Sequence, residues 1–171
     1  MLRLTSILFA SLLWGCGTPS TDETGTTAAA PPAGTDLSSY DLPLLVTLPD
    51  AQLTGGSEPQ LGWREEEGWF QVNAGDAFRL RISEEPGDFA RLKADLERDP
   101  IREARVIKEE PGLLVYRLEF PAEPGLVFVH FYQVITAGDR AFVVESDGEG
   151  RFTEADVERM RTSVTPKADP A

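Results

Sequence analysis

Residues 145–156 have the spacing of a calcium-binding loop, the closest that this chain comes to a set of metal ligands. Aligned with the loop of an EF-hand, five residues fall at the first, third, fifth, backbone-carbonyl and closing ligand positions. In that order they are Glu145, Asp147, Glu149, Arg151 and Asp156. Gly150 takes the place of the turn glycine and Phe152 that of the apolar residue. If these groups met around one ion, the protein would be a calcium-dependent module.

The same segment also fits a turn from a strand to a helix that needs no metal. Thr153 can cap a helix, and Asp156 then stands at the capping-box position. Glu145 has a longer side chain than the Asp that usually opens a calcium loop, and Asp156 a shorter one than the Glu that usually closes it. The sequence therefore favours the capped turn, and we predict that the loop binds no calcium. Calcium binding stays open as an alternative.

Other residues that carry chemistry are scarce. His130 is the single histidine and Cys16 the single cysteine, so the rest of the chain has neither a common zinc site nor a cysteine nucleophile. The chain also has no Gly-x-Ser-x-Gly, P-loop or dinucleotide-binding glycine pattern. We therefore predict that His130 is a hydrogen-bonded, partly buried structural residue. We also predict that the protein is not an enzyme and has no cofactor besides a covalent lipid.

Adjacent carboxylates offer a different chemistry, because a glycosidase uses two carboxyl groups that face each other across a cleft. The pairs are Glu66-Glu67, Glu84-Glu85 and Glu109-Glu110. In a chain with 29 acidic and 16 basic residues, such pairs arise on solvated turns without a catalytic role. A carboxylate-based hydrolase is therefore the second alternative to a binding protein.

Two tryptophans flank an acidic segment that reads as the tip of a hairpin. Trp63 precedes residues 65–67, which are all Glu, and Trp69 follows them. Exposed aromatic side chains often anchor recognition, so these two residues could stack on sugars or on a partner's side chains. Packing in the core or within the hairpin is the use that the sequence favours.

The N-terminus resembles that of a bacterial lipoprotein. Residues 1–14 give a short positive end and a mostly apolar segment with the length of a signal-peptide core, too short to span a bilayer. The segment ends in Leu13-Trp14-Gly15-Cys16. This ending resembles the lipobox, whose cysteine is lipidated and becomes the mature N-terminus. The resemblance implies a membrane anchor on Cys16, and Gly17 in place of Asp implies the outer membrane rather than the inner one.

The composition divides the chain into four parts. Residues 1–15 are the predicted signal peptide, and residues 16–37 are the lipidated cysteine and a flexible linker, because residues 18–36 contain no Leu, Ile, Val or aromatic residue. Residues 38–167 are long enough for a single domain, and residues 168–171 are a predicted disordered tail. The net charge of −13 argues against nucleic acid as a partner and against direct adsorption on anionic lipids.

Apolar runs and turn residues within 38–167 predict an α+β domain. Strands are expected at residues 44–48, 62–64, 68–72, 77–82, 104–108, 113–120, 126–135 and 140–146. One helix is expected from the cap Asp88 to before Pro100, and another from the cap Thr153 to Pro166, with Val164 in its buried stripe. Because no βαβ alternation is present, we expect an antiparallel sheet of about six to seven strands with two helices packed on it.

This order of strands, a helix, four further strands and a second helix resembles the PsbP-like group. The likeness covers roughly residues 42–164 and includes the ending from residues 142–144 to Phe152-Thr153 and then Val157 and Met160. The group consists of small exported domains and includes bacterial lipoproteins of the DcrB type. It implies an accessory or binding role in the envelope and no catalytic residue. The sequence therefore predicts a membrane-anchored envelope lipoprotein with a small acidic binding or assembly module, and an envelope protein as its candidate partner.

Overall fold

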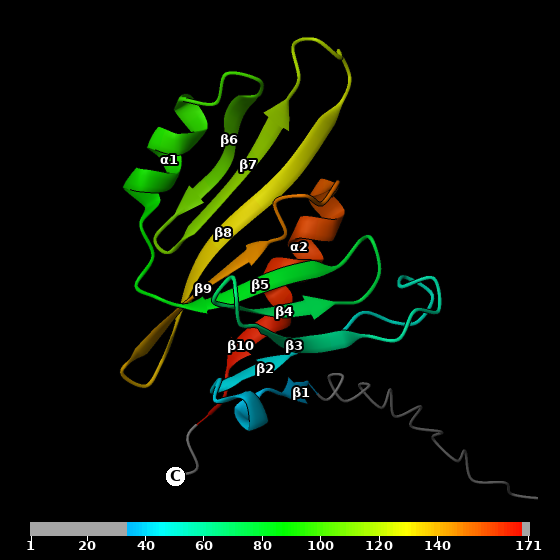
Figure 1. Ribbon diagram of the computed structural model, residues 1–171, viewed down its shortest axis with the longest axis vertical. Coiled ribbons are helices and arrows are strands. Elements are labelled where there is room, and N and C mark those ends of the chain that lie inside the picture. Colours follow the sequence, from blue (N-terminus) through cyan, green and yellow to red (C-terminus); the bar gives the residue numbers. More distant parts are fainter. Residues whose placement is uncertain (1–33, 169–171) are drawn as a thin grey trace, which may run out of the picture. The chain divides into compact units, whose positions relative to one another are not determined.

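A seven-stranded antiparallel sheet is the centre of the fold in the computed structural model, which describes residues 34–168 (Figure 1). Its strands stand in the order β3-β4-β5-β9-β8-β7-β6. Their bounds in that order are Gln60–Arg64, Trp69–Asn73, Arg79–Glu84, Arg140–Ser146, Val127–Ala137, Leu113–Glu119 and Glu103–Glu110. The predicted fold class, an α+β domain with a sheet of six to seven strands and two helices packed on it, is confirmed. Among the described residues, neither α-helix has the length and hydropathy of a membrane-spanning helix.

A second, three-stranded antiparallel sheet joins the two ends of the domain. Its order is β1-β2-β10, with bounds Thr35–Asp36, Leu44–Val46 and Val164–Pro166. A short 3₁₀ helix, η1, spans Ser38–Tyr40. Within the described residues, β1 thus precedes Ser38, the expected start of the domain, and the Leu37 side chain is fully buried. Asp36 also accepts a hydrogen bond from the Lys167 ammonium at 2.7 Å, which lowers the pKa of the Asp36 carboxyl.

Both predicted helices form at their predicted caps. Helix α1 spans Phe89–Glu97, and the Asp88 carboxylate accepts a hydrogen bond from the Arg91 N–H. Helix α2 spans Glu154–Ser163, and Thr153 and Asp156 form the complete capping box. The prediction that α2 continues through Val164 was wrong. Val164 is the first residue of β10, because the chain turns extended there and pairs with β2.

The two helices cover opposite faces of the large sheet. The side chains of β8 show this, since successive side chains of a strand point to opposite faces. On β8, Val129 and Phe131 belong to the core that also contains Val157 and Met160 of α2. Tyr132 points the other way, and its ring packs edge-on against Phe89 of α1 at 5.1 Å between centroids. We call the α2 side the inner face and the α1 side the outer face.

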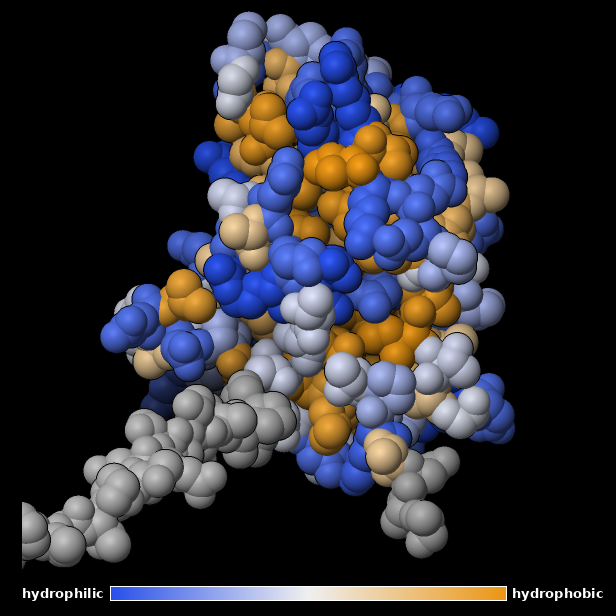
Figure 2. Space-filling view, turned by 180° about the vertical axis from the view of Figure 1, so that it is seen from behind, coloured by the Kyte–Doolittle hydropathy of each residue, from blue (hydrophilic) through white to orange (hydrophobic). Residues whose placement is uncertain are grey.

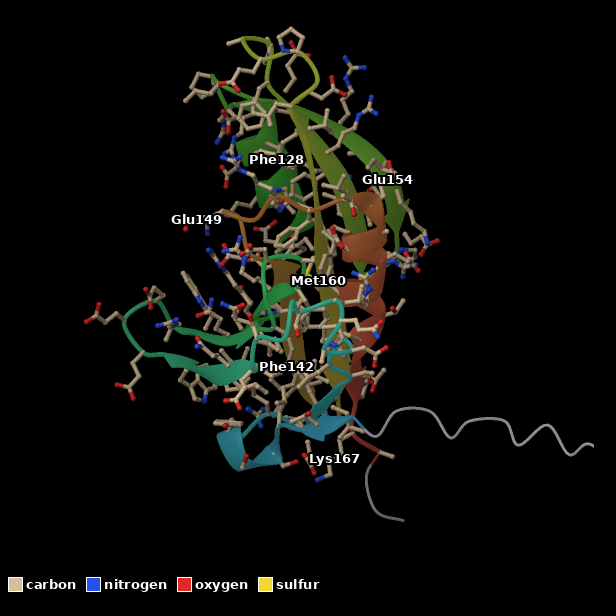
Figure 3. The ribbon with its side chains drawn as sticks, turned by 90° about the vertical axis from the view of Figure 1, so that its right-hand side faces the viewer. Phe128, Phe142, Glu149, Glu154, Met160 and Lys167 are labelled. Atoms are coloured by element: carbon tan, nitrogen blue, oxygen red, sulfur yellow. The ribbon has the colours of Figure 1, made fainter. Side chains whose placement is uncertain are left out.

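The core lies on the inner face, where α2 and the three-stranded sheet cover the large sheet. Strand β5 shows how the sequence arranges this, since Leu80 and Ile82 are buried in the core while Arg79 and Arg81 point to the outer face. In Figure 3, Met160 of α2 and Glu149 lie on different sides of the sheet. The view from behind shows hydrophobic residues between hydrophilic ones (Figure 2). A hollow of about 350 Å³ lies where α2 meets β6 and β7, with Ile107, Val115 and Val157 in its lining.

Candidate binding surface on the β3–β4 hairpin

The outer face is divided into two halves. Helix α1 packs over the half made by β6, β7 and β8. The other half is made by β3, β4, β5 and β9, and polar side chains of β3, β4 and β5 and of the loop after β9 line surface hollows on it. Cross-strand pairing places Gly62, Gln71, Arg81 and Glu145 in one row across these four strands. The alternation of the strands therefore collects residues from distant parts of the sequence on one open surface.

The larger hollow on this half has a volume of about 360 Å³, and Arg81, Asp147 and Trp69 are part of its lining. The Arg81 guanidinium donates a hydrogen bond to the Asp147 carboxylate at 2.7 Å and lies over the Trp69 ring, 4.4 Å from its centroid. Arg81 is thus held by an ion pair and a cation–π contact at once. The hollow is completed by Arg64, Glu67, Gln71 and Glu149.

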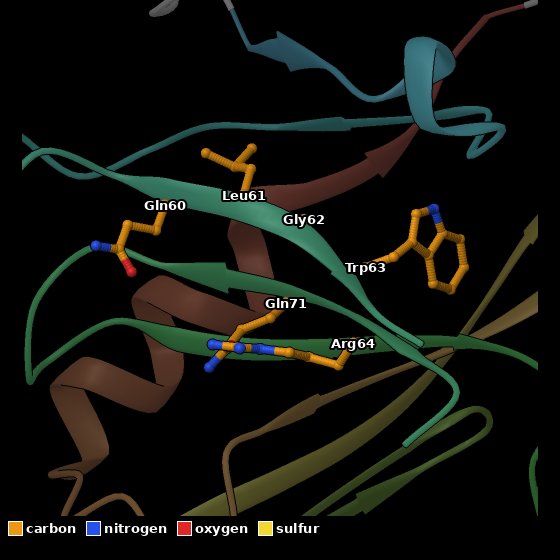
Figure 4. Close-up of a pocket in the computed structure, with 6 residues that line it drawn as sticks. All are labelled: Gln60, Leu61, Gly62, Trp63, Arg64 and Gln71. Atoms are coloured by element: carbon orange, nitrogen blue, oxygen red, sulfur yellow. The ribbon is translucent and has the colours of Figure 1, made fainter. Parts of the chain in front are cut away.

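A smaller hollow of about 180 Å³ runs along β3, the edge strand of the sheet, and shares Arg64 and Gln71 with the larger one. Every residue of β3 lines it, so it follows the edge of the strand rather than one face. Figure 4 shows Leu61 and Trp63 on one side of β3, and Arg64 and Gln71 on the other. The Arg64 guanidinium donates a hydrogen bond to the Gln71 side-chain oxygen at 2.6 Å. We call β3 together with Trp69, Gln71 and Arg81 the hairpin surface.

The two edges of the large sheet differ in how they are protected against further pairing. Strand β6 carries five charged side chains and its register with β7 shifts between Val106 and Lys108, both of which discourage another strand from adding to an edge. Strand β3 has one charged residue, Arg64, and its register with β4 is unbroken. Within residues 34–168, β4 is the one strand that pairs with β3. The edge at β3 is therefore the open one.

The five residues that align with a calcium loop have partners in different parts of the domain. The Asp147 carboxylate accepts hydrogen bonds from the Arg81 guanidinium and, at 2.9 Å, from the Glu149 N–H. The Asp156 carboxylate accepts hydrogen bonds from Thr153 and Arg159. Glu145 lies within β9, where burial raises the pKa of its carboxyl. Among the described residues, no group of three or more His, Cys, Asp or Glu side chains is placed to hold a metal ion. The loop instead supplies Asp147 and Glu149 to the hairpin surface.

Gly150 was aligned with the turn glycine of a calcium loop, but its surroundings give another reason for a glycine. Its φ is not positive, and a Cβ at this position would meet the ring of Phe152 directly. Phe152 is buried in the core. Gly150 therefore lets Phe152 pack just before α2 begins.

His130 is buried, as the single histidine was expected to be in part, and it lines neither hollow of the hairpin surface. Its Nδ1 is 3.0 Å from the Ser146 hydroxyl, and its ring stacks on Tyr116 with 5.8 Å between centroids. Burial lowers the pKa of His130 to about 4. Within the described residues its Nε2 is buried without a hydrogen-bond partner. The imidazole is thus neutral at ordinary pH and acts as a packing residue.

The paired carboxylates are dispersed over separate turns and strands. Glu84 binds Arg140 through two hydrogen bonds of 2.8 and 2.7 Å, which lower the pKa of the Glu84 carboxyl. Glu109 is paired with Lys93 of α1. Glu66 and Glu67 lie at the exposed tip between β3 and β4. The structure therefore gives the pairs structural partners or solvent.

Both tryptophans pack against other side chains of the domain, and Trp63 is also partly exposed. Trp63 packs edge-on against Phe70 and donates a hydrogen bond from its indole N–H to the Tyr40 carbonyl at 3.2 Å, yet 42% of its surface is exposed. Trp69 carries the Arg81 guanidinium on its ring. Sequence reasoning missed the partnership of Arg81 and Asp147, which are 66 positions apart. The signal that pointed to it was the alternation in β5, which places two arginines opposite the core.

The predicted lipidation residue, Cys16, lies outside the residues that the structure describes. Comparison of the chain with models of protein families, with curated proteins and with solved structures gave no match.

Proposed function

We propose that this chain is a lipid-anchored protein of the cell envelope whose domain binds a partner protein through the hairpin surface. The observation that carries the binding role is the contrast between the two sheet edges: β6 is bulged and charged, whereas β3 is regular and bordered by a hollow. Natural sheets protect the edges that must not pair. An edge left regular beside an exposed tryptophan supports recognition of another protein.

The anchor is supported by the resemblance of Leu13-Trp14-Gly15-Cys16 to a lipobox. A lipid on Cys16 would attach the domain to a membrane through the segment that precedes β1, with the outer membrane as the favoured location. A domain held in this way meets other envelope proteins at high effective concentration, so a modest affinity is enough for a specific complex.

The anchor is tested by mass spectrometry of the mature N-terminus. The wild-type protein should begin at Cys16 and carry acyl chains, and Cys16→Ala should leave an unprocessed precursor. An unmodified cysteine, or cleavage at another bond, would contradict the lipoprotein assignment.

The binding role is tested by purifying the protein from detergent-solubilised envelopes and identifying proteins that accompany it. Arg64→Glu on the hairpin surface should remove the specific companion. Arg91→Glu is the matched control, because it makes the same charge change on an exposed residue of α1. Loss of the companion in both variants, or in neither, would contradict binding at the hairpin surface.

A further inference from the structure

The edge of β3 is shaped for an extended peptide. A peptide that adds to a sheet edge gains main-chain hydrogen bonds from the strand and specificity from the alternate side chains on each side. The hollow along β3 involves all five of its residues, and a Cβ built on Gly62 has no neighbour within 4 Å. The hollow therefore runs along the edge of the strand, and the face of the sheet over Gly62 is also open.

The two sides of β3 have different chemistry. On the inner side Leu61 packs against the core and Trp63 exposes part of its ring beside Tyr40 and Phe70, so this side is apolar. On the outer side Arg64 binds Gln71 and Gly62 is open, so this side is polar. A strand that fits both sides alternates apolar and polar residues.

Acidic residues stand at both ends of the edge. Glu58 lies shortly before β3, and residues 65–67 follow it as three consecutive exposed glutamates. Within residues 34–168, none of these four carboxylates has a basic side chain at ion-pair distance. The chain as a whole carries a net charge of −13. Opposite charge on the ends of a partner strand would therefore favour its association.

The same charges oppose a second copy of this chain as the occupant. Antiparallel pairing of two β3 strands about Gly62 would bring the glutamates that follow one strand close to Glu58 of the other copy. Repulsion between these carboxylates, added to the negative charge of both copies, disfavours that pairing.

We propose that the edge of β3 takes up an extended segment of a partner protein as an added β-strand, with apolar side chains over Leu61 and Trp63, polar ones beside Gly62 and Arg64, and basic residues at its ends. This proposal rests on the proposed function and names the chemistry of the partner. It assigns binding to the backbone of β3 rather than to the larger hollow around Arg81.

The probe is the peptide Lys-Thr-Val-Thr-Val-Thr-Lys, whose pattern reads the same in both directions and places valine opposite Leu61 and Trp63. Its binding to the full-length mature chain in detergent micelles is measured by fluorescence anisotropy of a labelled peptide. The Lys-flanked peptide should bind at least about tenfold more tightly than a Glu-flanked version at low salt. Equal affinity of the two peptides, or no binding of the Lys-flanked peptide, would overturn the proposal.

Two further comparisons separate strand addition from simple charge attraction. N-methylation of the peptide residues whose N–H groups point towards β3 should abolish binding. N-methylation of the residues whose N–H groups point away from β3 should not. Replacing residues 65–67 by Gln should weaken binding by about tenfold, whereas replacing Glu103, Glu109 and Glu110 of β6 by Gln removes the same charge and should leave it unchanged. An affinity that backbone methylation does not change, or that falls equally in both triple variants, would overturn strand addition.

Failure of this proposal is distinguishable from failure of the proposed function. If Arg64→Glu loses the envelope companion while no peptide binds, the hairpin surface binds a folded partner and strand addition is wrong. If the peptides bind as expected, β3 accepts a strand whatever the envelope experiment finds.

Discussion

Removing the Asp147 carboxylate should destabilise the domain far more than removing an ordinary surface carboxylate. Asp147 is 6% exposed and holds the Arg81 guanidinium at 2.7 Å. Asp147→Ala leaves this guanidinium without its partner charge, and Arg81 already has a buried Nε that no group within residues 34–168 satisfies. Asp147→Ala also removes the acceptor for the Glu149 N–H.

The structure sets the size of this effect. Breaking a buried ion pair by removing one partner costs about 3–5 kcal/mol. The Arg81 side chain keeps 22% of its surface exposed, and water screens part of the uncompensated charge, so we expect a loss of about 2 kcal/mol in the free energy of unfolding. Asp147→Asn retains an oxygen for the Glu149 N–H and should lose about 1 kcal/mol.

Urea unfolding followed by circular dichroism measures these changes. Asp95→Ala is the control, because Asp95 is 58% exposed and its pairing with Arg91 is a surface contact. It should change the free energy of unfolding by less than about 0.5 kcal/mol. The double variant Arg81→Met/Asp147→Ala should be more stable than Asp147→Ala alone, since no charge is then left without a partner. A loss from Asp147→Ala as small as that of the control would refute the assigned role of the pair.

Four further predictions concern separate parts of the domain. The pKa of His130 is about 4, below its ordinary value of 6.5, so the unfolded chain takes up the proton before the folded one as the pH falls. The free energy of unfolding should therefore be retained above about pH 7 and fall by about 2 kcal/mol towards about pH 5. NMR titration of the single imidazole measures the pKa, and His130→Gln should flatten the pH dependence. A pKa of His130 near 6.5 in the folded protein would contradict its burial. Gly150→Ala should cost about 1–3 kcal/mol because its Cβ meets Phe152, whereas Gly148→Ala, where a Cβ has open space, should cost about 0.5 kcal/mol or less; equal losses in thermal unfolding would contradict this packing. A chain that starts at Ser38 lacks the buried Leu37 and the strand β1. In urea unfolding it should be less stable than a chain that starts at Gly34 by about 2 kcal/mol or more. Equal stability of the two chains would show that β1 and Leu37 contribute nothing. Millimolar calcium should not raise the melting temperature above a magnesium control, and a rise that disappears in Asp147→Ala would restore the calcium-binding alternative.

Most of the fold could be predicted because residues close together in the sequence determine it, through helix caps and alternating apolar residues. The cap residues Asp88 and Thr153 mark the helix starts, and the alternation around β5 marks both a strand and its buried face. The ends of the domain were harder. Leu37 is a lone apolar residue at the end of a polar segment, and its burial depends on pairing between β1 and β2. Val164 continues the apolar spacing of α2, yet pairing with Val46 of β2 holds it in a strand.

The binding surface could not be predicted because long-range pairing assembles it. The row from Gly62 to Glu145 depends on the register of three strand pairs, and nothing in the sequence states that register. The partner of Asp147 could not be predicted for the same reason, since Arg81 comes from β5, a distant part of the chain. The openness of the β3 edge likewise emerges only from the strand order.

The central claim is that the β3 edge contacts another envelope protein, and site-specific photocrosslinking in intact envelopes tests it most directly. A photoreactive amino acid replaces Gln60 on β3 in one variant and Glu103 on β6 in the other, since both residues are exposed on edge strands. We predict a discrete crosslinked product with another protein from the Gln60 position and none from the Glu103 position. The same products from both positions, or a product from Glu103 alone, would contradict the claim.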